Sequence, residues 1–298
     1  MELRERILSG VAVEERRLRI GETDTSVLEA GQGPSIVLLH GGIECGGVYW
    51  APVISGLAER YRVLVPDLPG VGASMPVARI DRAAFVDWLA AFLNLTCSEK
   101  PTLIAHSLLG SFAALFAAER GDHLRRLLIY GAPGIGPYNM PLGLLVTAIR
   151  FDLRPSQPNH ERFERWAFFN RDCTWARDPD RFEAFSAYSV SRAKVPHVKR
   201  TMRQLIKAGT RQIPDETLAR IRVPTALLWG RHDRMAPLRL AESASAKFGW
   251  PLHVVEDAGH VPHMEQPERF LTALREALRT SKPLLVSGQG GHHDDIAR

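Results

Sequence analysis

The sequence predicts an α/β protein with a mostly parallel sheet of eight strands, helices on both of its faces and a helical insertion. Short apolar runs of strand length alternate with helical patterns, and turn-forming residues separate the two. The alternation stops between residues 135 and 222 and then resumes. Parallel strands joined by helices build a sheet that is covered on both sides and binds ligands at the carboxyl ends of its strands.

Eight segments have the length and composition of strands. The first two flank a turn at Gly21-Glu22, and the alternation of polar and apolar residues there predicts a half-exposed hairpin. The other six are apolar runs, which are typical of buried strands. The predicted strands are residues 11–20, 25–30, 35–40, 61–66, 102–105, 127–130, 224–230 and 252–256.

Helical patterns lie between the predicted strands. Residues 49–58 fit a helix, and Asp81 stands at the N-cap position of a helix with a stripe of aromatic residues on one face. Core packing explains such a stripe. Apolar residues at helical spacing follow Ser107, another helix follows Pro237, and the last helix begins at Pro267.

The insertion is rich in aromatic and arginine residues and contains no clear buried strand. Its predicted helices are residues 142–151, 160–169, 180–193 and 196–208. An aromatic helical insertion above the carboxyl ends of a sheet would form a lid with an apolar underside. We therefore divide the chain into a core, a cap and a tail that we expect to be disordered. The core comprises residues 1–134 and 223–286, the cap residues 135–222, and the tail residues 287–298.

The composition is that of an ordinary globular protein. Hydrophobic residues make up 45% of the 298 residues, and the formal net charge is only +5. The basic residues are scattered among acidic ones, which does not indicate binding to nucleic acid. The chain has no apolar run of membrane-spanning length, and its first residues lack the apolar core of a signal peptide. Three widely spaced cysteines fit reduced thiols. We expect a cytoplasmic protein without a metal, a cofactor, a nucleic-acid partner or a membrane partner, and the sequence leaves open whether it forms a homodimer.

Ser107 stands where a buried strand must turn into a helix, in the segment Ala105-His106-Ser107-Leu108-Leu109-Gly110. Such a turn holds a serine out of the sheet and points the first amides of the helix toward it. A hydroxyl in that place can attack a carbonyl while backbone donors bind the negative charge. The usual pattern is Gly-X-Ser-X-Gly. Ala105 is a mild departure from it, whereas Leu109 replaces a residue that normally packs closely on backbone, and Gly110 follows.

Other loops at the same edge of the sheet provide the groups that a serine nucleophile needs. His40-Gly41-Gly42-Ile43 follows a strand, and the amide of Gly42 or Ile43 would complete an oxyanion hole together with that of Leu108. Asp233 and His260 follow the last two strands. Serine, acid and histidine thus occur in the chain order typical of this chemistry.

Competing residues exist for two of these roles. His232 and His263 lie near the expected site, but neither follows a glycine as His260 does. Glu265 is an alternative carboxylate, which we place instead near the positive start of the last helix. His106 precedes the nucleophile and is expected to shape the pocket.

Taken together, these segments resemble the α/β-hydrolase superfamily over residues 24–280. The segments that carry the resemblance are His40-Gly41-Gly42, Asp67-Leu68-Pro69-Gly70-Val71-Gly72-Ala73-Ser74, Gly230-Arg231-His232-Asp233-Arg234-Met235-Ala236-Pro237 and Gly259-His260 with Glu265-Gln266-Pro267. The His-Gly-Gly start and the insertion are similar to hydrolases that cleave C–C bonds in ring-cleavage products. Val261 stands where that subfamily usually has Trp. Dehalogenases and epoxide hydrolases of the superfamily use an Asp nucleophile, and Ser107 argues against both.

The resemblance implies a serine hydrolase that cleaves a small-to-medium, largely apolar ester or lactone through an acyl-enzyme on Ser107. We expect Ile43, His106, Trp166 and Val261 to contact this substrate. Two alternatives stay open. One is hydrolysis of a C–C bond in a vinylogous diketone, and the other is a binder of apolar ligands with little or no turnover, which a turn disturbed by Leu109 would favour.

Overall fold

The computed structural model describes residues 2–41, 44–172 and 178–280. Its sheet has eight strands in the order β1-β2-β4-β3-β5-β6-β7-β8. Strands β1 and β2 are antiparallel to each other, β2 is antiparallel to β4, and all other neighbours are parallel. The strands are β1 (Glu14–Ile20), β2 (Thr23–Ala30), β3 (Ser35–Leu39), β4 (Arg62–Pro66), β5 (Thr102–His106), β6 (Arg126–Tyr130), β7 (Thr225–Gly230) and β8 (Leu252–Val255).

The central strands end level with one another. Leu39 of β3 pairs with Ala105 of β5, and His106 of β5 pairs with Tyr130 of β6, which pairs in turn with Leu228 of β7. The loops that follow these strands therefore leave the sheet at one edge. This register brings residues that are far apart in the sequence to a common site.

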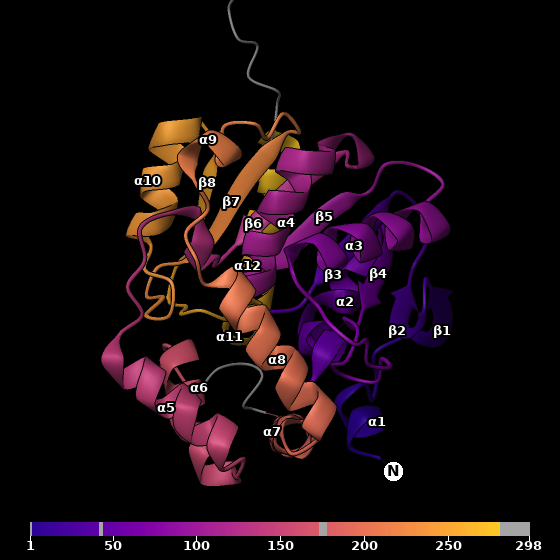
Figure 1. Cartoon of the computed structure of the whole chain (residues 1–298), viewed down its shortest axis with the longest axis vertical. Helices are drawn as coiled ribbons and strands as arrows, with labels where there is room; N and C mark the ends of the chain where they lie inside the picture. Colours follow the sequence, from indigo (N-terminus) through magenta and orange to yellow (C-terminus); the bar gives the residue numbers. More distant parts are fainter. Residues whose placement is uncertain (1, 42–43, 173–177, 281–298) are drawn as a thin grey trace, which may run out of the picture.

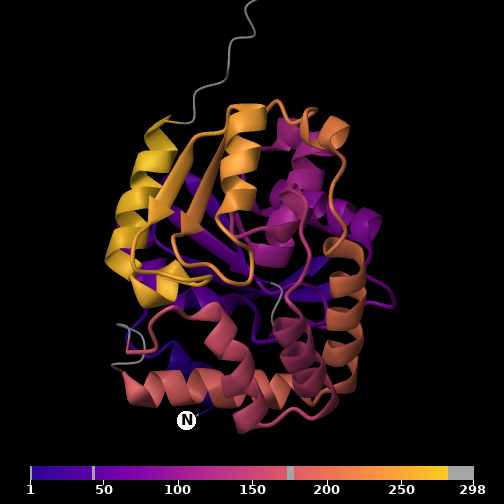
Figure 2. The ribbon, with the colours of Figure 1, turned by 90° about the vertical axis from the view of Figure 1, so that its left-hand side faces the viewer.

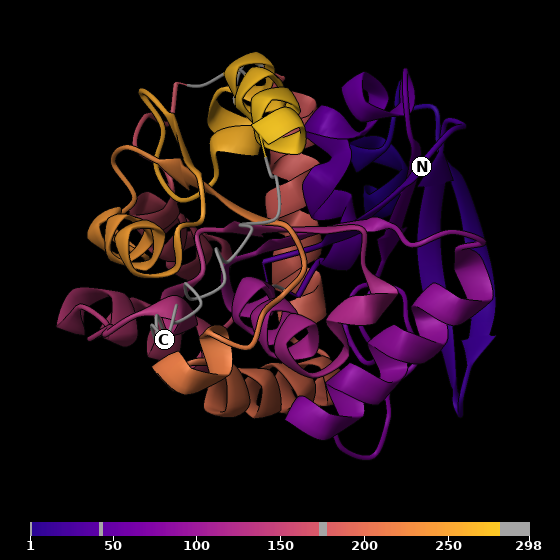
Figure 3. The ribbon, with the colours of Figure 1, turned by 90° about the horizontal axis from the view of Figure 1, so that it is seen from above.

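Helices cover both faces of the sheet, as Figure 3 shows. Alternate residues of the strands face opposite sides, as the pleat requires. One apolar cluster contains Leu103 and Ala105 of β5 with residues of α3, α4 and α10, and the other contains Ile104 with residues of α2 and α12. The core helices are α1 (Leu3–Ile7), η1 (Gly46–Trp50), α2 (Ala51–Ala58), α3 (Arg82–Thr96), α4 (Ser107–Arg120), η2 (Gly121–His123), η3 (Pro133–Ile135), α10 (Arg239–Phe248), α11 (Pro262–Glu265) and α12 (Pro267–Thr280).

Between β6 and β7, the described part of the chain forms helices and no strand. After η3, these helices are α5 (Leu142–Leu153), α6 (Gln157–Ala167), α7 (Pro179–Ala193), α8 (Pro196–Gly209) and α9 (Asp215–Leu218). Figures 1 and 2 show α5 to α8 gathered beneath the sheet, at the end toward which the arrows of β7 and β8 point in Figure 2. Within the helical segment 135–222, helices α5 to α8 thus lie over the edge at which the strand-end loops meet, whereas α9 lies at the opposite end of the sheet in Figure 1.

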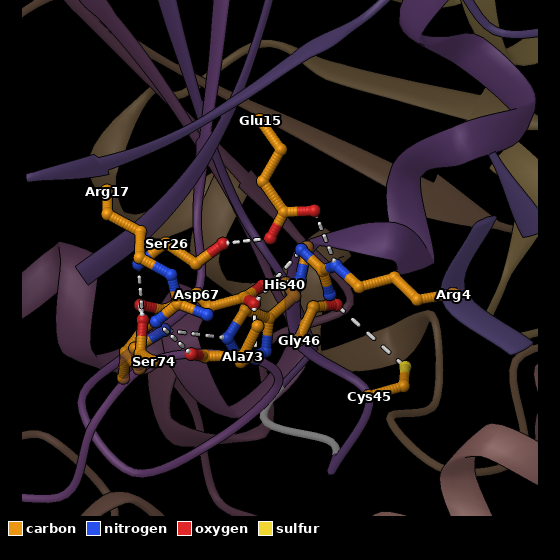
Figure 4. A network of polar contacts seen from close by, with 12 residues as sticks. Arg4, Glu15, Arg17, Ser26, His40, Cys45, Gly46, Asp67, Ala73 and Ser74 are labelled. Atoms are coloured by element: carbon orange, nitrogen blue, oxygen red, sulfur yellow. Dashed lines mark hydrogen bonds and ion pairs between the residues drawn. The ribbon is translucent and has the colours of Figure 1, made fainter. Parts of the chain in front are cut away.

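A buried polar network holds the loop that follows β4 (Figure 4). The Asp67 carboxylate is fully buried, accepts hydrogen bonds from the amides of Ala73 (2.7 Å) and Gly47, and lies 3.2 Å from Nη2 of Arg4. Nε of Arg4 donates to Glu15 at 3.0 Å. The network ties α1 and β1 to the loops after β3 and β4, and the loop after β3 borders the cavity near Ser107.

The predicted sheet of eight mostly parallel strands is confirmed, and so are Asp81 as an N-cap, whose side chain accepts from the Ala84 amide at 3.0 Å, and Pro267 as the start of the last helix. The first strand is shorter than predicted, because residues 11–13 form a turn in which the Val13 amide donates to the Val11 carbonyl. Helices α1, α9 and α11 were not predicted, since helices of four or five residues contain too few turns to show a period. The tail 287–298 lies outside the described residues. None of the described helices is long and apolar enough to span a membrane.

Candidate active site

Ser107 stands on a tight turn between β5 and α4. Its φ angle is +52°, in the left-handed region that residues other than glycine rarely adopt. Because α4 begins at Ser107, the first amides of the helix have no carbonyl partner within it, and they carry the positive end of the helix dipole. The turn therefore stores backbone strain at Ser107, next to the first amides of α4, of which the Leu108 amide is the nearest in sequence.

Ser107, His260 and Asp233 form a continuous chain of hydrogen bonds. Oγ of Ser107 lies 2.8 Å from Nε2 of His260, and Nδ1 of the same ring lies 2.8 Å from Oδ2 of Asp233. The second oxygen of Asp233 accepts the amides of Met235 (2.8 Å) and Ala236 (2.7 Å). This carboxylate is therefore fixed as an acceptor for an Nδ1–H donor, which leaves Nε2 free to accept the Ser107 proton.

The close packing against neighbouring backbone, which the usual pattern places two residues after the serine, occurs here at Gly110, three residues after it. Leu109 is fully buried in the apolar cluster that packs against α3 and α4. The close approach falls on Gly110, where a Cβ atom would lie 2.8 Å from Cβ of Ala132 and 3.0 Å from the carbonyl oxygen of Ala105. Leu109 thus fills the core and does not obstruct Ser107.

The loop that carries His260 is fixed by backbone contacts to the helical segment. The His260 amide donates to the Ala167 carbonyl at 2.7 Å, at the end of α6. The Glu265 carboxylate accepts three amides, from Gly259 (2.6 Å), Phe169 (2.8 Å) and Asn170 (3.0 Å). Glu265 comes just before α12, as its position in the sequence indicates, but its side chain turns to the histidine loop. Burial raises the pKa of this carboxyl, while the three amides oppose the rise.

Buried aromatic side chains form hydrogen bonds to the backbone carbonyl of His260. His106 is 1% exposed, with Nδ1 at 2.9 Å from the Tyr49 hydroxyl and Nε2 at 2.9 Å from the His260 carbonyl oxygen. The Tyr130 hydroxyl lies 3.1 Å from the same carbonyl oxygen and 2.8 Å from Nδ1 of His263. Burial lowers the pKa of His106 well below its usual range and that of His263 to about 3, so both rings are neutral. Sequence reasoning missed Tyr49, Tyr130 and His263 in this role.

A cavity of about 440 Å³ lies between Ser107 and the helical segment. Ser107, Leu108 and His260 form one part of its lining, and α5, α6, α7 and α8 supply most of the rest. The apolar lining from these helices includes Leu144, Leu145, Ile149, Phe151, Phe163 and Met202. Such a space suits an apolar ligand of modest size.

Two of the four residues expected at the substrate, His106 and Val261, line this cavity. Trp166 does not. It lies between Phe163 and Ala167, which do line the cavity, and its ring packs on Gly143 and lies 5.9 Å from the Arg234 guanidinium. Ile43 and the predicted donor Gly42 lie outside the described residues. Within the described parts of the chain, no group of three or more His, Cys, Asp or Glu residues could hold a metal ion.

Comparisons with known proteins agree with this architecture. The chain is 30% identical over 258 residues to a pimeloyl-[acyl-carrier protein] methyl ester esterase of Chromobacterium violaceum, with 84% of this chain and 96% of the relative covered. It is 25% identical to a 2-hydroxy-6-oxo-6-phenylhexa-2,4-dienoate hydrolase of Burkholderia cepacia, with coverage of 81% and 86%. A carboxylesterase structure from Bacillus subtilis superposes with a TM-score of 0.78 at 21% identity, over 93% of this chain and 95% of that one.

A family model for the alpha/beta hydrolase family matches residues 36–273, a range that contains Ser107, Asp233 and His260 and all of the helical segment. On this match, the chain belongs to the alpha/beta hydrolase family.

Proposed function

We propose that the protein is a serine hydrolase that cleaves a small-to-medium, largely apolar ester or lactone. The observation that supports it most strongly is the chain of 2.8 Å hydrogen bonds from Ser107 through His260 to Asp233, which borders a largely apolar cavity. The relatives include a protein named as a methyl ester esterase.

In this proposal, Oγ of Ser107 attacks the carbonyl carbon of the substrate as Nε2 of His260 takes its proton. The negative charge on the carbonyl oxygen is stabilised by the Leu108 amide at the start of α4 and by the amide of Gly42 as the second expected donor. The imidazolium then protonates the leaving alcohol, which departs and leaves an acyl group on Ser107. Water attacks this ester with His260 as the base, and the serine is restored as the acid leaves.

The helical segment 135–222 would serve as a cap on the core formed by residues 1–134 and 223–286. Helices α5 to α8 supply most of the apolar lining above Ser107, and the end of α6 bonds to the His260 amide. A cap of this kind would exclude water from the acyl-enzyme and select substrates by shape.

A panel of p-nitrophenyl esters of increasing chain length, together with aliphatic lactones, tests the proposal. We expect turnover by the wild type, with a preference for medium chains, and a loss of at least about a thousandfold in kcat for Ser107→Ala. Retention of esterase activity by folded Ser107→Ala would refute the assignment of the nucleophile. Tight binding of these compounds without turnover would identify a binder instead.

A second candidate is the hydrolysis of a C–C bond in a vinylogous diketone. The similarity to a protein named 2-hydroxy-6-oxo-6-phenylhexa-2,4-dienoate hydrolase supports it, whereas Val261 next to the histidine does not match the Trp that is usual in such enzymes. Loss of the visible absorbance of that dienoate on mixing with wild-type protein would favour this candidate. Turnover of esters without turnover of the dienoate would favour the first.

A further inference from the structure

Polar side chains of α6 and α7 interrupt the apolar lining of the cavity. Glu164 of α6 and Ser189 of α7 both line it, although they are only 4% and 1% exposed. His160 lines the same region, and its Nδ1 lies 2.7 Å from the Ser186 hydroxyl. Buried polar groups are normally paired. The hydrogen-bonded chain of Ser107, His260 and Asp233 does not explain why these polar groups lie in the cavity wall.

Glu164 is the residue whose pairing is incomplete. Within the described residues, neither of its carboxyl oxygens has a hydrogen-bond partner. The nearest ionic groups are Nδ1 of His160 at 3.5 Å and Nη2 of Arg171 at 4.0 Å, both too far for a hydrogen bond by strict geometry. Leaving a buried acid unpaired costs free energy that a bound partner would recover.

The protonation state of the cluster indicates what that partner is. Burial raises the pKa of Glu164 to about 8, against the opposing effect of Arg171 and with a small addition from Glu161. Burial lowers the pKa of His160 to about 4. At neutral pH, Glu164 is therefore mainly an uncharged acid that can both donate and accept a hydrogen bond.

Ser189 adds a second unpaired polar group, about one helical turn along α7 from Ser186, whose hydroxyl lies 2.7 Å from Nδ1 of His160. Its hydroxyl has no hydrogen-bond partner that meets strict geometry among the described residues, and it lies beside the thiol of Cys45, a weak partner. The two groups together offer donors and acceptors without a net charge. An ammonium ion is disfavoured there by Arg171. An ionised carboxylate is disfavoured by the cost of removing a charge from water into a buried site.

The helix that carries Glu164 ends beside the loop that carries His260. The carbonyl of Ala167, the last residue of α6, accepts the His260 amide, so this helix ends at the histidine. With a rise of about 1.5 Å per residue, Glu164 lies about 4.5 Å further along the helix axis than Ala167. Ser107 and Glu164 line the same cavity, so the chain of a substrate held at Ser107 can reach Glu164 through it.

We propose that Glu164 and Ser189 form a second, polar subsite, which binds an uncharged oxygen group, such as a ketone or hydroxyl, on the otherwise apolar chain of the ester that Ser107 attacks. The inference rests on the proposed function. It adds that the natural substrate is an oxygenated ester and not a plain hydrocarbon one.

Chain-matched esters test the subsite. One set contains p-nitrophenyl hexanoate and its oxo analogues with the ketone at successive carbons of the acyl chain. A second set contains plain alkyl acetates and their oxo analogues, which place the ketone in the alcohol half of the ester. We expect the wild type to prefer at least one oxo ester over its plain counterpart by about three- to tenfold in kcat/KM, as one hydrogen bond confers. Glu164→Leu should abolish the preference while plain esters remain substrates, and Glu164→Gln should retain it because an amide also donates and accepts.

Glu161→Gln is the matched control, since Glu161 lies on the same helix and does not line the cavity. It should leave the preference unchanged. Equal rates for all oxo and plain pairs in the wild type, or a preference that persists in Glu164→Leu, would overturn the subsite. A stronger preference for p-nitrophenyl 6-aminohexanoate or for the mono-p-nitrophenyl ester of adipate than for any oxo ester would also overturn the subsite.

If Glu164→Leu does not fold, Ser189→Ala replaces it and should reduce the preference at least about twofold. Failure of the subsite is distinguishable from failure of the proposed function. In the first case plain esters are still hydrolysed at Ser107, and in the second no ester is hydrolysed at all.

Discussion

Replacement of Asp233 by Asn separates the role of this carboxylate in orienting His260 from its role in packing. Oδ1 of Asp233 accepts two amides, those of Met235 and Ala236, and Oδ2 faces Nδ1 of His260. In the Asn variant the carbonyl oxygen must stay with the two amides, because an NH₂ group there would face two donors. The NH₂ group then points at Nδ1, which must become an acceptor, and the proton moves to Nε2. A ring protonated at Nε2 cannot take the proton of Ser107.

The rate should therefore fall although the fold is kept. A wrong tautomer of the base costs about a factor of 10⁴ in kcat, or about 5.5 kcal/mol of transition-state stabilisation. The assay is the steady-state hydrolysis of the best p-nitrophenyl ester, with thermal unfolding as the check on folding. Asp257→Asn is the control, since Asp257 is exposed and lies in the same loop as His260, and among the described residues its carboxylate pairs only with Arg269. A folded Asp233→Asn variant within about tenfold of the wild type would refute this account of the tautomer.

Three further outcomes are expected. Glu265→Gln should lower the free energy of unfolding by about 2–4 kcal/mol in urea titration. In the wild type three backbone amides donate to the Glu265 carboxylate, and in the variant the NH₂ group of Gln would face at least one of these donors. An unchanged midpoint would contradict this. Leu109→Ala should cost about 2–5 kcal/mol in the same assay while Ser107 stays reactive, because Leu109 fills the core. A Leu109→Ala variant with the wild-type free energy of unfolding would show that Leu109 does not fill the core. Glu164→Gln should gain thermal stability relative to the wild type as the pH rises from about 4.5 to about 8, since wild-type Glu164 keeps a proton that the unfolded chain releases. A constant difference in Tm across this range would contradict the raised pKa, because the shift of His160 is common to both proteins.

The strands and the order of the site residues were predictable because the signals are local. Apolar runs such as residues 102–105 and 225–230 occur in the sequence at strand length, and parallel topology then brings the ends of the strands together. The serine was recognisable despite Leu109, since the residues around it still change from a strand pattern to a helix pattern. The structure adds that Gly110 takes over the close contact.

The contacts that sequence reasoning missed act across the fold. Glu265 binds amides almost a hundred residues away, and Tyr130 reaches the His260 carbonyl from a different strand. No local pattern encodes such pairings. Trp166 illustrates a related limit, because an amphipathic pattern identifies the apolar face of α6 but not which of its neighbours, Phe163 or Trp166, turns toward the cavity. The packing of α6 against α5 and α7 decides that.

Covalent labelling of the folded protein with a fluorophosphonate, followed by peptide mapping, tests most directly whether Ser107 is the nucleophile. We expect one adduct, on Ser107, that is absent in Ser107→Ala and forms far more slowly in His260→Ala. Labelling of another residue, or no labelling of a folded wild-type protein, would contradict this expectation.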